Sequence, residues 1–312
     1  MNKHCHRIIF NAARGQYMVV SETATTNRPA SARDSGTRRG SCGSLSLRLQ
    51  DLSRALALAF GLFLALPMHT SLHAQIVADP NAPGAQRPTV LAAPNGTPVV
   101  NIQTPSAAGI SRNTYQQFDV QGNGAILNNS RGNVQTQLGG WVQGNPWLAG
   151  GSARVILNEV NSANPSQLRG FIEVAGQRAE IVIANPAGIQ IDGAGFVNAS
   201  RATLTTGTPL LQGGQLDGYQ VQRGTITIHG AGLDASLTDH TGILARAIEL
   251  NAGVWAQDLK VVGGVNDISA DHSAVNAQAA TGGAAAPAFA LDVSQLGGMY
   301  AGKIHLVGTE AG

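Results

Sequence analysis

Residues 189–196 read IQIDGAGF, and two later stretches repeat the same order of residue types, ITIHGAGL at 226–233 and IELNAGV at 248–254. Each begins with apolar and polar residues in alternation, continues with a polar residue, and ends with small residues before an apolar one. Such alternation over a few positions indicates a β-strand with one buried face, and the small residues indicate a tight corner after it. The three stretches therefore predict strand–corner units that recur along the chain.

The spacing of these units favours a parallel β-helix. Their small-residue pairs begin at residues 194, 231 and 252, so the steps between them are 37 and 21 residues. One step near 20 residues and one of nearly twice that length suit a β-helix in which each coil stacks its short strands on those of the preceding coil. A β-sandwich would also give short strands with frequent turns, and it stays the alternative on this evidence.

Similar alternating runs occupy much of the remaining chain, whereas helical periodicity is hard to find. Further runs lie at 99–102, 171–174, 179–183, 259–262 and 303–307. They are bounded by Gly, Asn, Asp and Pro, the residues that favour tight turns. We therefore predict an all-β protein.

The first 74 residues have the organisation of an export leader. Twelve apolar residues at 55–66, ALALAFGLFLAL, are too few for a transmembrane helix, which needs roughly 17–25. Basic residues precede this run and small residues follow it, which is the pattern of a secretory signal peptide. We assign residues 23–74 to a spacer and this Sec signal peptide, with cleavage between Ala74 and Gln75. The 238 residues that remain are enough for one large domain.

Charge divides at the same place. Residues 1–74 hold nine basic and three acidic residues, a net charge of +6, while residues 75–312 hold 11 basic and 15 acidic residues, a net charge of −4. A negatively charged domain has no electrostatic reason to bind nucleic acid, and we predict no such partner.

Both cysteines belong to the leader. Cys5 and Cys42 precede the predicted cleavage site, so the exported chain would carry no disulfide. His4 and His6 flank Cys5, but this triplet in a discarded leader supplies no closed metal shell. We predict neither a metal nor another cofactor.

Residues 1–22 carry MNK at 1–3, RIIFN at 7–11, RG at 14–15 and MVVSE at 18–22. In these motifs they resemble the extended signal peptide region found on large type V secretion proteins of Gram-negative bacteria. The resemblance implies a segment that tunes export across the inner membrane.

Residues 75–312 carry a series of motifs in a fixed order. They include QIVAD at 75–79, GTPVVNI at 96–102, GISRN at 109–113, FDV at 118–120 and GMYAGKI at 298–304. Two motifs, usually written NPNL and NPNGI, align with Asn145-Pro146-Trp147-Leu148 and with Asn185-Pro186-Ala187-Gly188-Ile189. In this series the chain resembles the N-terminal secretion domain of two-partner secretion exoproteins, which include filamentous haemagglutinin-like adhesins, haemolysins and contact-dependent growth-inhibition toxins.

The resemblance implies a right-handed parallel β-helix with N-terminal capping strands. It implies a secretion-targeting function, in which the periplasmic domains of a cognate outer-membrane β-barrel transporter recognise the chain after Sec export. The protein would then be secreted or held at the cell surface, after transit through the periplasm. Any receptor on a host or neighbouring cell would be bound by a region beyond Gly312, because we expect the domain to be truncated at its C-terminus.

The two aligned motifs have two compatible roles under this resemblance. They are corner turns that allow the coils to fold, and they are candidates for transporter recognition. Asn-Pro favours a turn because proline fixes φ and asparagine can bond its own backbone. Trp147 and Ala187 replace the second asparagine of each motif, which removes any contact made by those amide side chains.

A β-helical carbohydrate-active enzyme, or a carbohydrate-binding adhesin acting in its own right, is the alternative function. Candidate acid–base groups and sugar-binding aromatics are Asp192, Asp234, Asp239, Asp258, Asp267, Asp271, His229, His240, Trp141, Trp147 and Trp255. The acidic residues and histidines form no recognised catalytic spacing and stand where turns require polar residues. We therefore predict no catalytic residues and no enzymatic activity.

Overall fold

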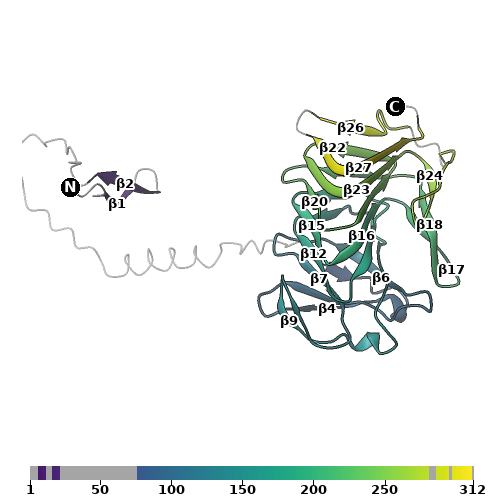
Figure 1. The fold of residues 1–312 in the computed structure, drawn as a ribbon, viewed down its shortest axis with the longest axis horizontal. Helices are drawn as coiled ribbons and strands as arrows, with labels where there is room; N and C mark the ends of the chain where they lie inside the picture. Colours follow the sequence, from purple (N-terminus) through teal and green to yellow (C-terminus); the bar gives the residue numbers. More distant parts are fainter. Residues whose placement is uncertain (1–5, 12–15, 22–75, 281–285, 295–296, 311–312) are drawn as a thin grey trace, which may run out of the picture. The chain divides into compact units, whose positions relative to one another are not determined.

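The computed structural model describes residues 6–11, 16–21, 76–280, 286–294 and 297–310 (Figure 1). In the N-terminal unit, β1 (His6–Asn11) and β2 (Gln16–Ser21) pair as an antiparallel hairpin. The apolar run at 55–66 and the predicted cleavage residues Ala74 and Gln75 lie outside the described residues. The second unit holds all the other described strands.

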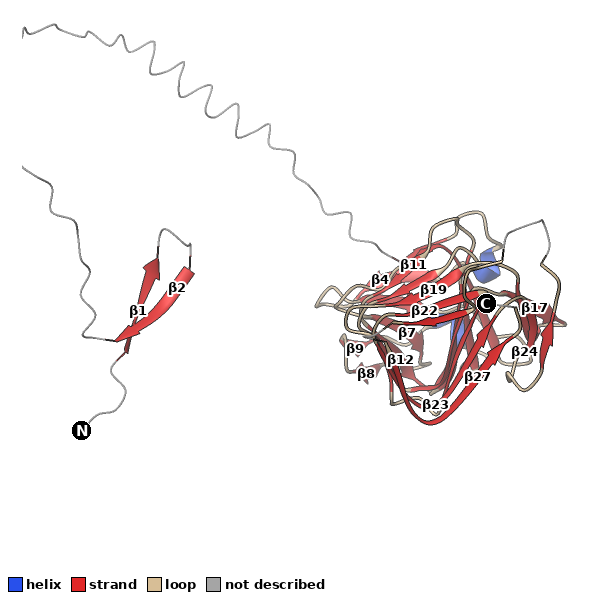
Figure 2. Ribbon diagram, turned by 90° about the horizontal axis from the view of Figure 1, so that it is seen from above, coloured by secondary structure: helices blue, strands red, loops and turns tan. Residues whose placement is uncertain are grey.

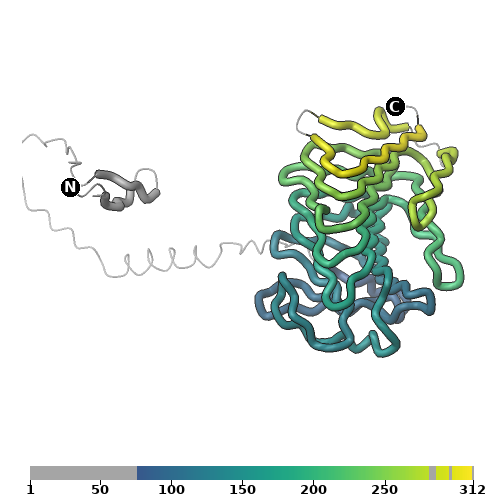
Figure 3. The backbone as a smooth tube through the Cα atoms, in the orientation of Figure 1, coloured from purple at the N-terminus to yellow at the C-terminus, as the bar shows by residue number. Residues whose placement is uncertain are grey.

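This second unit is a parallel β-helix whose coils each pass through three faces (Figures 1 and 3). The first face contains β11 (Ser166–Leu168), β14 (Ile189–Ile191), β19 (Thr225–Ile228), β22 (Ala247–Leu250) and β26 (Leu291–Val293). The second face contains β7 (Ala125–Asn129), β12 (Phe171–Gly176), β15 (Ala194–Val197) and β20 (Leu233–Ala235). The third face contains β6 (Ile110–Phe118), β10 (Val155–Val160), β13 (Ala179–Ala184), β16 (Ala199–Thr205) and β21 (His240–Ala245).

Two long strands continue from the second face onto the third. The first part of β23 (Gly253–Gly263) pairs with β20, and its last part pairs with β21. The final strand, β27 (Gly298–Gly308), is parallel to β23 along both parts. Figure 2, seen along the stack of coils, shows the strands of the three faces arranged around a common interior.

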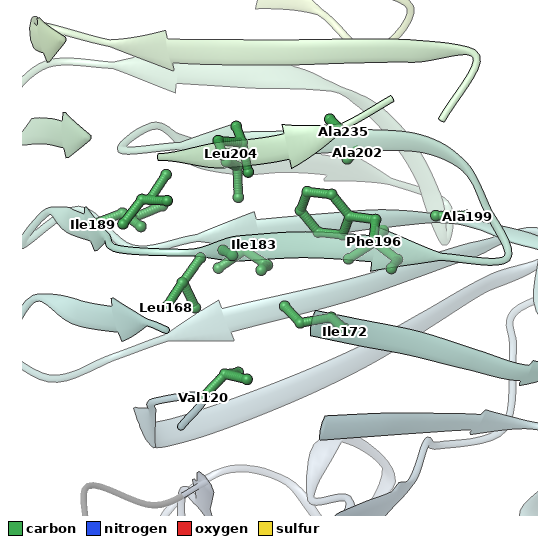
Figure 4. Packing of buried hydrophobic residues seen from close by; sticks show 14 of the residues in the cluster. Val120, Leu168, Ile172, Ile183, Ile189, Phe196, Ala199, Ala202, Leu204 and Ala235 are labelled. Carbon is green, nitrogen blue, oxygen red and sulfur yellow. The ribbon is translucent and has the colours of Figure 1, made fainter. Parts of the chain in front are cut away.

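Apolar side chains directed inward from the three faces form the main core. Ile189, Ile226 and Ile248 are paired neighbours on successive strands, and each is at most 1% exposed. Figure 4 labels other members of this core: Val120, Leu168, Ile172, Ile183, Phe196, Ala199, Ala202, Leu204 and Ala235. Full burial of one large aliphatic side chain contributes about 1.5–3 kcal/mol, so this interior is the principal source of stability. The predicted all-β, right-handed parallel β-helix is confirmed, and the sandwich alternative is wrong.

The 37-residue step is one coil rather than two. Strand β14 pairs directly with β19, so a single turn of the helix runs from residue 189 to residue 226. The additional residues form a hairpin outside the helix, made of β17 (Thr208–Gln212) and β18 (Gln215–Val221). The expectation of a doubled step was therefore wrong, because an insertion at a corner lengthens the coil without adding another.

The aligned repeats also have corners of different length. The stretches that begin at 189 and 226 are in register on the first face, but on the second face Ala194 pairs with Leu233 instead of Ala231. The corner after β19 therefore contains two more residues than the corner after β14. Asp192 stabilises this longer corner, since its Oδ1 accepts a hydrogen bond of 2.9 Å from the amide of Ala231.

Capping strands close the N-terminal end of the helix, as predicted. The capping elements are β3 (Ile76–Ala78), η1 (Gly84–Gln86), β4 (Thr89–Ala92), β5 (Pro98–Asn101), β8 (Val134–Thr136), β9 (Gly140–Val142) and η2 (Pro146–Leu148). Strand β3 is antiparallel to β6. Strand β4 is antiparallel to β5, and β5 pairs in parallel with β7 of the second face. The only helical elements in the described part of the chain are η1 and η2, and neither could cross a membrane.

An antiparallel sheet outside the helix covers the outer side of the third face. It has the order β17-β18-β24-β25, where β24 is Asn266–Ser269 and β25 is Val275–Ala277. A second apolar cluster fills the space between this sheet and the helix, with Leu157, Val182 and Leu244 on one side and Tyr219 and Ile268 on the other. We call this four-stranded sheet the outer sheet. The sequence patterns did not predict it.

Candidate functional site

The first predicted motif forms a turn in the N-terminal cap. Asn145 precedes η2, and its Oδ1 accepts a hydrogen bond of 3.0 Å from the amide of Trp147. Its Nδ2 donates to the carbonyls of Ile102 and Asn128, each at 2.9 Å. Asn145 is 3% exposed and Leu148 is fully buried. The side chain of Asn145 thus joins η2 to the ends of β5 and β7.

The second motif forms a similar turn at the corner between the third and first faces. Asn185 is fully buried, and its Oδ1 accepts a hydrogen bond of 2.9 Å from the amide of Ala187. Its Nδ2 donates to the carbonyl of Asn164 and to Oγ of Ser166, each at 3.0 Å. Gly188 then adopts a φ of +122°, which an L-residue rarely adopts, before Ile189 enters the core.

Both turns use the same device, and it explains why the third position of each motif can change. In each case the asparagine carboxamide accepts a bond from the main-chain amide two residues later. The side chain at that later position is not needed for the bond, so Trp147 and Ala187 keep the turn intact. The structure therefore accounts for the corner-turn role of the motifs, while transporter recognition stays a prediction.

The residues of the motifs differ in how far they reach the surface. Pro146 and Trp147 are exposed, with Trp147 at 45%, whereas Pro186 and Ala187 are half-buried. Pro146 lines a surface hollow of about 710 Å³ together with Leu91 and Trp141, both largely exposed.

Pro186 lines a separate hollow. This hollow has a volume of about 240 Å³, and it includes Glu159 and Arg223. The two motifs thus lie at different places, one in the cap and one beside the outer sheet, and the structure does not bring them into one site.

The acidic residues considered for catalysis are dispersed. Asp192 lies 4.0 Å from His229, Asp239 pairs with Arg178 at 2.9 Å, and Asp258 lies 3.5 Å from His240. Asp271 accepts hydrogen bonds from the hydroxyls of Ser269 and Ser273, which hold its pKa below the usual range. Within the described residues, no group of three or more His, Cys, Asp or Glu side chains is placed to hold a metal ion.

A buried histidine beneath the outer sheet is a polar feature that the sequence did not indicate. His272 is 6% exposed, has a φ of +63°, and places Nε2 3.3 Å from Oγ1 of Thr203. Burial lowers the pKa of His272 to about 4, and the positive charges of Arg201 and Lys260 act in the same direction. Sequence patterns could not locate this residue because they did not predict the sheet that covers it.

The chain matches two known protein families. The sequence model of the TPS secretion domain family matches residues 74–312, and that of the Extended Signal Peptide of Type V secretion system matches residues 1–51. Toxin CdiA of Yersinia pestis is 55% identical over the whole chain, and tRNA nuclease CdiA-2 of Burkholderia pseudomallei is 46% identical over the whole chain. The chain spans only 9% and 10% of the lengths of these two relatives.

A solved structure has the same fold. The crystal structure of the filamentous hemagglutinin secretion domain superimposes with a TM-score of 0.70 and 37% sequence identity, covering 76% of this chain and 80% of that one.

Proposed function

Because the chain belongs to the TPS secretion domain family, we propose that it targets a longer exoprotein to a dedicated outer-membrane transporter. The protein is a type V secretion exoprotein of a Gram-negative bacterium, secreted or exposed at the cell surface. The observation that carries the proposal is the match of the TPS family model to residues 74–312, the segment that contains every described strand of the capped β-helix. The matched signal peptide model implies Sec export as the preceding step.

The β-helix suits a protein that must cross a membrane before it folds. Each coil contacts mainly the coils beside it, so an emerging chain can add coils one at a time onto a folded end. The capping strands supply that end, because β3, β4 and β5 close the side from which stacking would proceed. Both cysteines lie within residues 1–51, so no disulfide in the β-helix domain can trap the chain in the oxidising periplasm.

We assign folding and transporter recognition to different parts of the two Asn-Pro motifs. We infer that the buried amides of Asn145 and Asn185 act in folding, because all their hydrogen bonds are made inside the domain. Exposed Pro146 and Trp147 are better placed to contact the transporter. Strand addition is a further means of contact, since β4 is the terminal strand of the large sheet and its side chains are mostly exposed.

We propose that this domain itself is not catalytic. The Burkholderia relative is named a nuclease, but this chain matches only 10% of the length of that protein. The matching portion is a secretion domain, in which Asp192 stabilises a corner and Asp239 forms a surface ion pair. Nuclease activity therefore belongs to other portions of such proteins.

Co-expression tests the proposal. The chain is produced in a Gram-negative host with and without its cognate transporter, and the medium and periplasm are compared by immunoblot. We expect the chain in the medium only when the transporter is present. Retention in the periplasm, under conditions in which the same transporter exports a longer relative, would contradict the proposal, as would equal release without the transporter.

A further inference from the structure

A column of paired residues crosses the outer side of the second face. Phe171 pairs with Gly195, Gly195 with Asp234, Asp234 with Trp255, and Trp255 with Tyr300. The rings of Trp255 and Tyr300 are stacked, with centroids 5.9 Å apart and planes inclined by 14°. The column of aromatic residues is therefore interrupted at its second and third positions, which carry Gly195 and Asp234.

The interruption forms a hollow of about 560 Å³ between Phe171 and Trp255. The ring of Phe171 extends over Gly195, where a Cβ atom would collide with it, so Phe171 covers part of the interrupted length. Adjacent strands are roughly 4.8 Å apart, so Phe171 and Trp255 begin about 14 Å apart along the stack. Because the ring of Phe171 extends over Gly195, the space that remains between Phe171 and Trp255 suits one flat or compact chemical group. We call this hollow the Phe171–Trp255 slot.

The slot carries negative charge on its floor. Oδ1 of Asp234 accepts hydrogen bonds from the amide of Ser236 at 3.1 Å and from its hydroxyl at 2.6 Å. Its other oxygen, Oδ2, has no hydrogen bond within the described part of the chain. Asp192 binds the amide of Ala231 at the rim, and no lysine or arginine is among the lining residues.

We propose that the Phe171–Trp255 slot binds an organic monocation, a guanidinium or quaternary ammonium group. Two aromatic walls attract a cation through the negative faces of their rings, and the free oxygen of Asp234 supplies the counter-charge. A guanidinium adds planar stacking and hydrogen bonds to the carboxylate, whereas a quaternary ammonium depends on the aromatic walls and charge alone. This binding function is separate from secretion targeting, because none of the motif residues lines the slot.

Fluorescence of Trp255 tests the proposal directly. The chain has three tryptophans, so Trp141→Phe and Trp147→Phe leave Trp255 as the single reporter in the purified full chain. Choline and ethylguanidinium are titrated against it, with 3,3-dimethyl-1-butanol as the uncharged shape match of choline. We expect a saturable change in emission with at least one cation, and a midpoint at least tenfold higher with the neutral compound.

Three variants in the same background locate the binding. Asp234→Asn is expected to raise the midpoint at least tenfold, and Phe171→Leu to raise it several-fold. Asp217→Asn, an exposed acid on the outer sheet, is the matched control and is expected to leave it unchanged. Circular dichroism verifies that each variant is folded. No saturable change with either cation, equal binding of the neutral compound, or an unchanged midpoint in Asp234→Asn would each overturn the proposal.

Discussion

Asn145 shows how a single buried amide supports the cap, since it makes three hydrogen bonds to main-chain atoms. Asn145→Ala would leave buried carbonyl and amide groups unpaired, at about 1–3 kcal/mol for each unsatisfied group. We predict a loss of about 2–4 kcal/mol in the free energy of unfolding, measured by urea denaturation of the purified chain. Trp147→Ala, two residues away and 45% exposed, is the control and should change stability by less than about 1 kcal/mol. Equal losses in both variants would show that the turn does not depend on the carboxamide.

His272 makes stability depend on pH. Its pKa is about 4 in the folded chain against an ordinary 6.5, so the unfolded chain binds more protons between these values. Stability should therefore be complete above about pH 6.5 and should fall as the pH drops toward 4. The shift corresponds to a loss of about 3 kcal/mol at the acid end.

Urea denaturation at pH 7, 5.5 and 4.5 measures this dependence. His272→Asn should flatten it, because asparagine tolerates the positive φ of this position and does not titrate. Exposed His305 supplies the control variant His305→Asn, which should keep the wild-type slope. Arg201, Lys260, Asp271 and His240 act on His272 electrostatically and are unchanged in both variants. The same slope in His272→Asn as in the wild type would refute the assignment.

The third face of the β-helix is apolar on both sides. Leu157 of β10 is directed toward the outer sheet and is fully buried, although simple alternation would place it in solvent. Leu157→Ala should cost about 2–5 kcal/mol, as expected for a leucine in a packed core. Leu210 of β17, 40% exposed, is the matched control, and Leu210→Ala should cost less than about 1 kcal/mol in the same denaturation assay. A small effect at Leu157 would mean that the outer sheet does not pack on the helix.

Individual elements show why sequence patterns predicted the coils better than the insertions. The isoleucines at 189, 226 and 248 gave the correct register on the first face because alternation reports local burial. The corner after β19 has two additional residues, and nothing in the alternation indicates that Ala194 pairs with Leu233. The outer sheet depends on the pairing of β18 with β24, a contact between distant segments that no local pattern specifies. The capping strands were predicted only through the family resemblance.

Sequence patterns likewise predicted some features of the candidate sites and not others. The Asn-Pro pairs predicted turns at Asn145 and Asn185 because their chemistry is local, and each asparagine accepts a hydrogen bond from the amide two residues later. The Phe171–Trp255 slot was not predicted, although Trp255 and Asp234 were both considered, because their proximity depends on how the coils are stacked. Recognition by the transporter involves a second protein, and it stays a prediction.

Across the β-helix domain, protection from hydrogen exchange should follow the number of neighbours that each strand has. Amides of β13 and β16 bond to strands on both sides within the third face, whereas β4 has one partner and mostly exposed side chains. We predict that amides of β13 exchange at least a hundredfold more slowly than those of β4, measured by mass spectrometry of the purified chain. The control is a brief exchange in urea, which should remove the difference. Uniform protection across both strands would contradict this gradient.

The pairing of β18 with β24 has a mechanical consequence. These strands belong to excursions that leave the helix before β19 and after β23, so their antiparallel contact bypasses the intervening coil. A chain pulled from its C-terminal end would peel coil by coil until the load reached this pair. There the force would have to break the pairing of β18 with β24 and also separate the outer sheet from the apolar cluster beneath it. A longer protein that carries such a domain would therefore resist mechanical unfolding of the β-helix from its C-terminal side at this pair of strands.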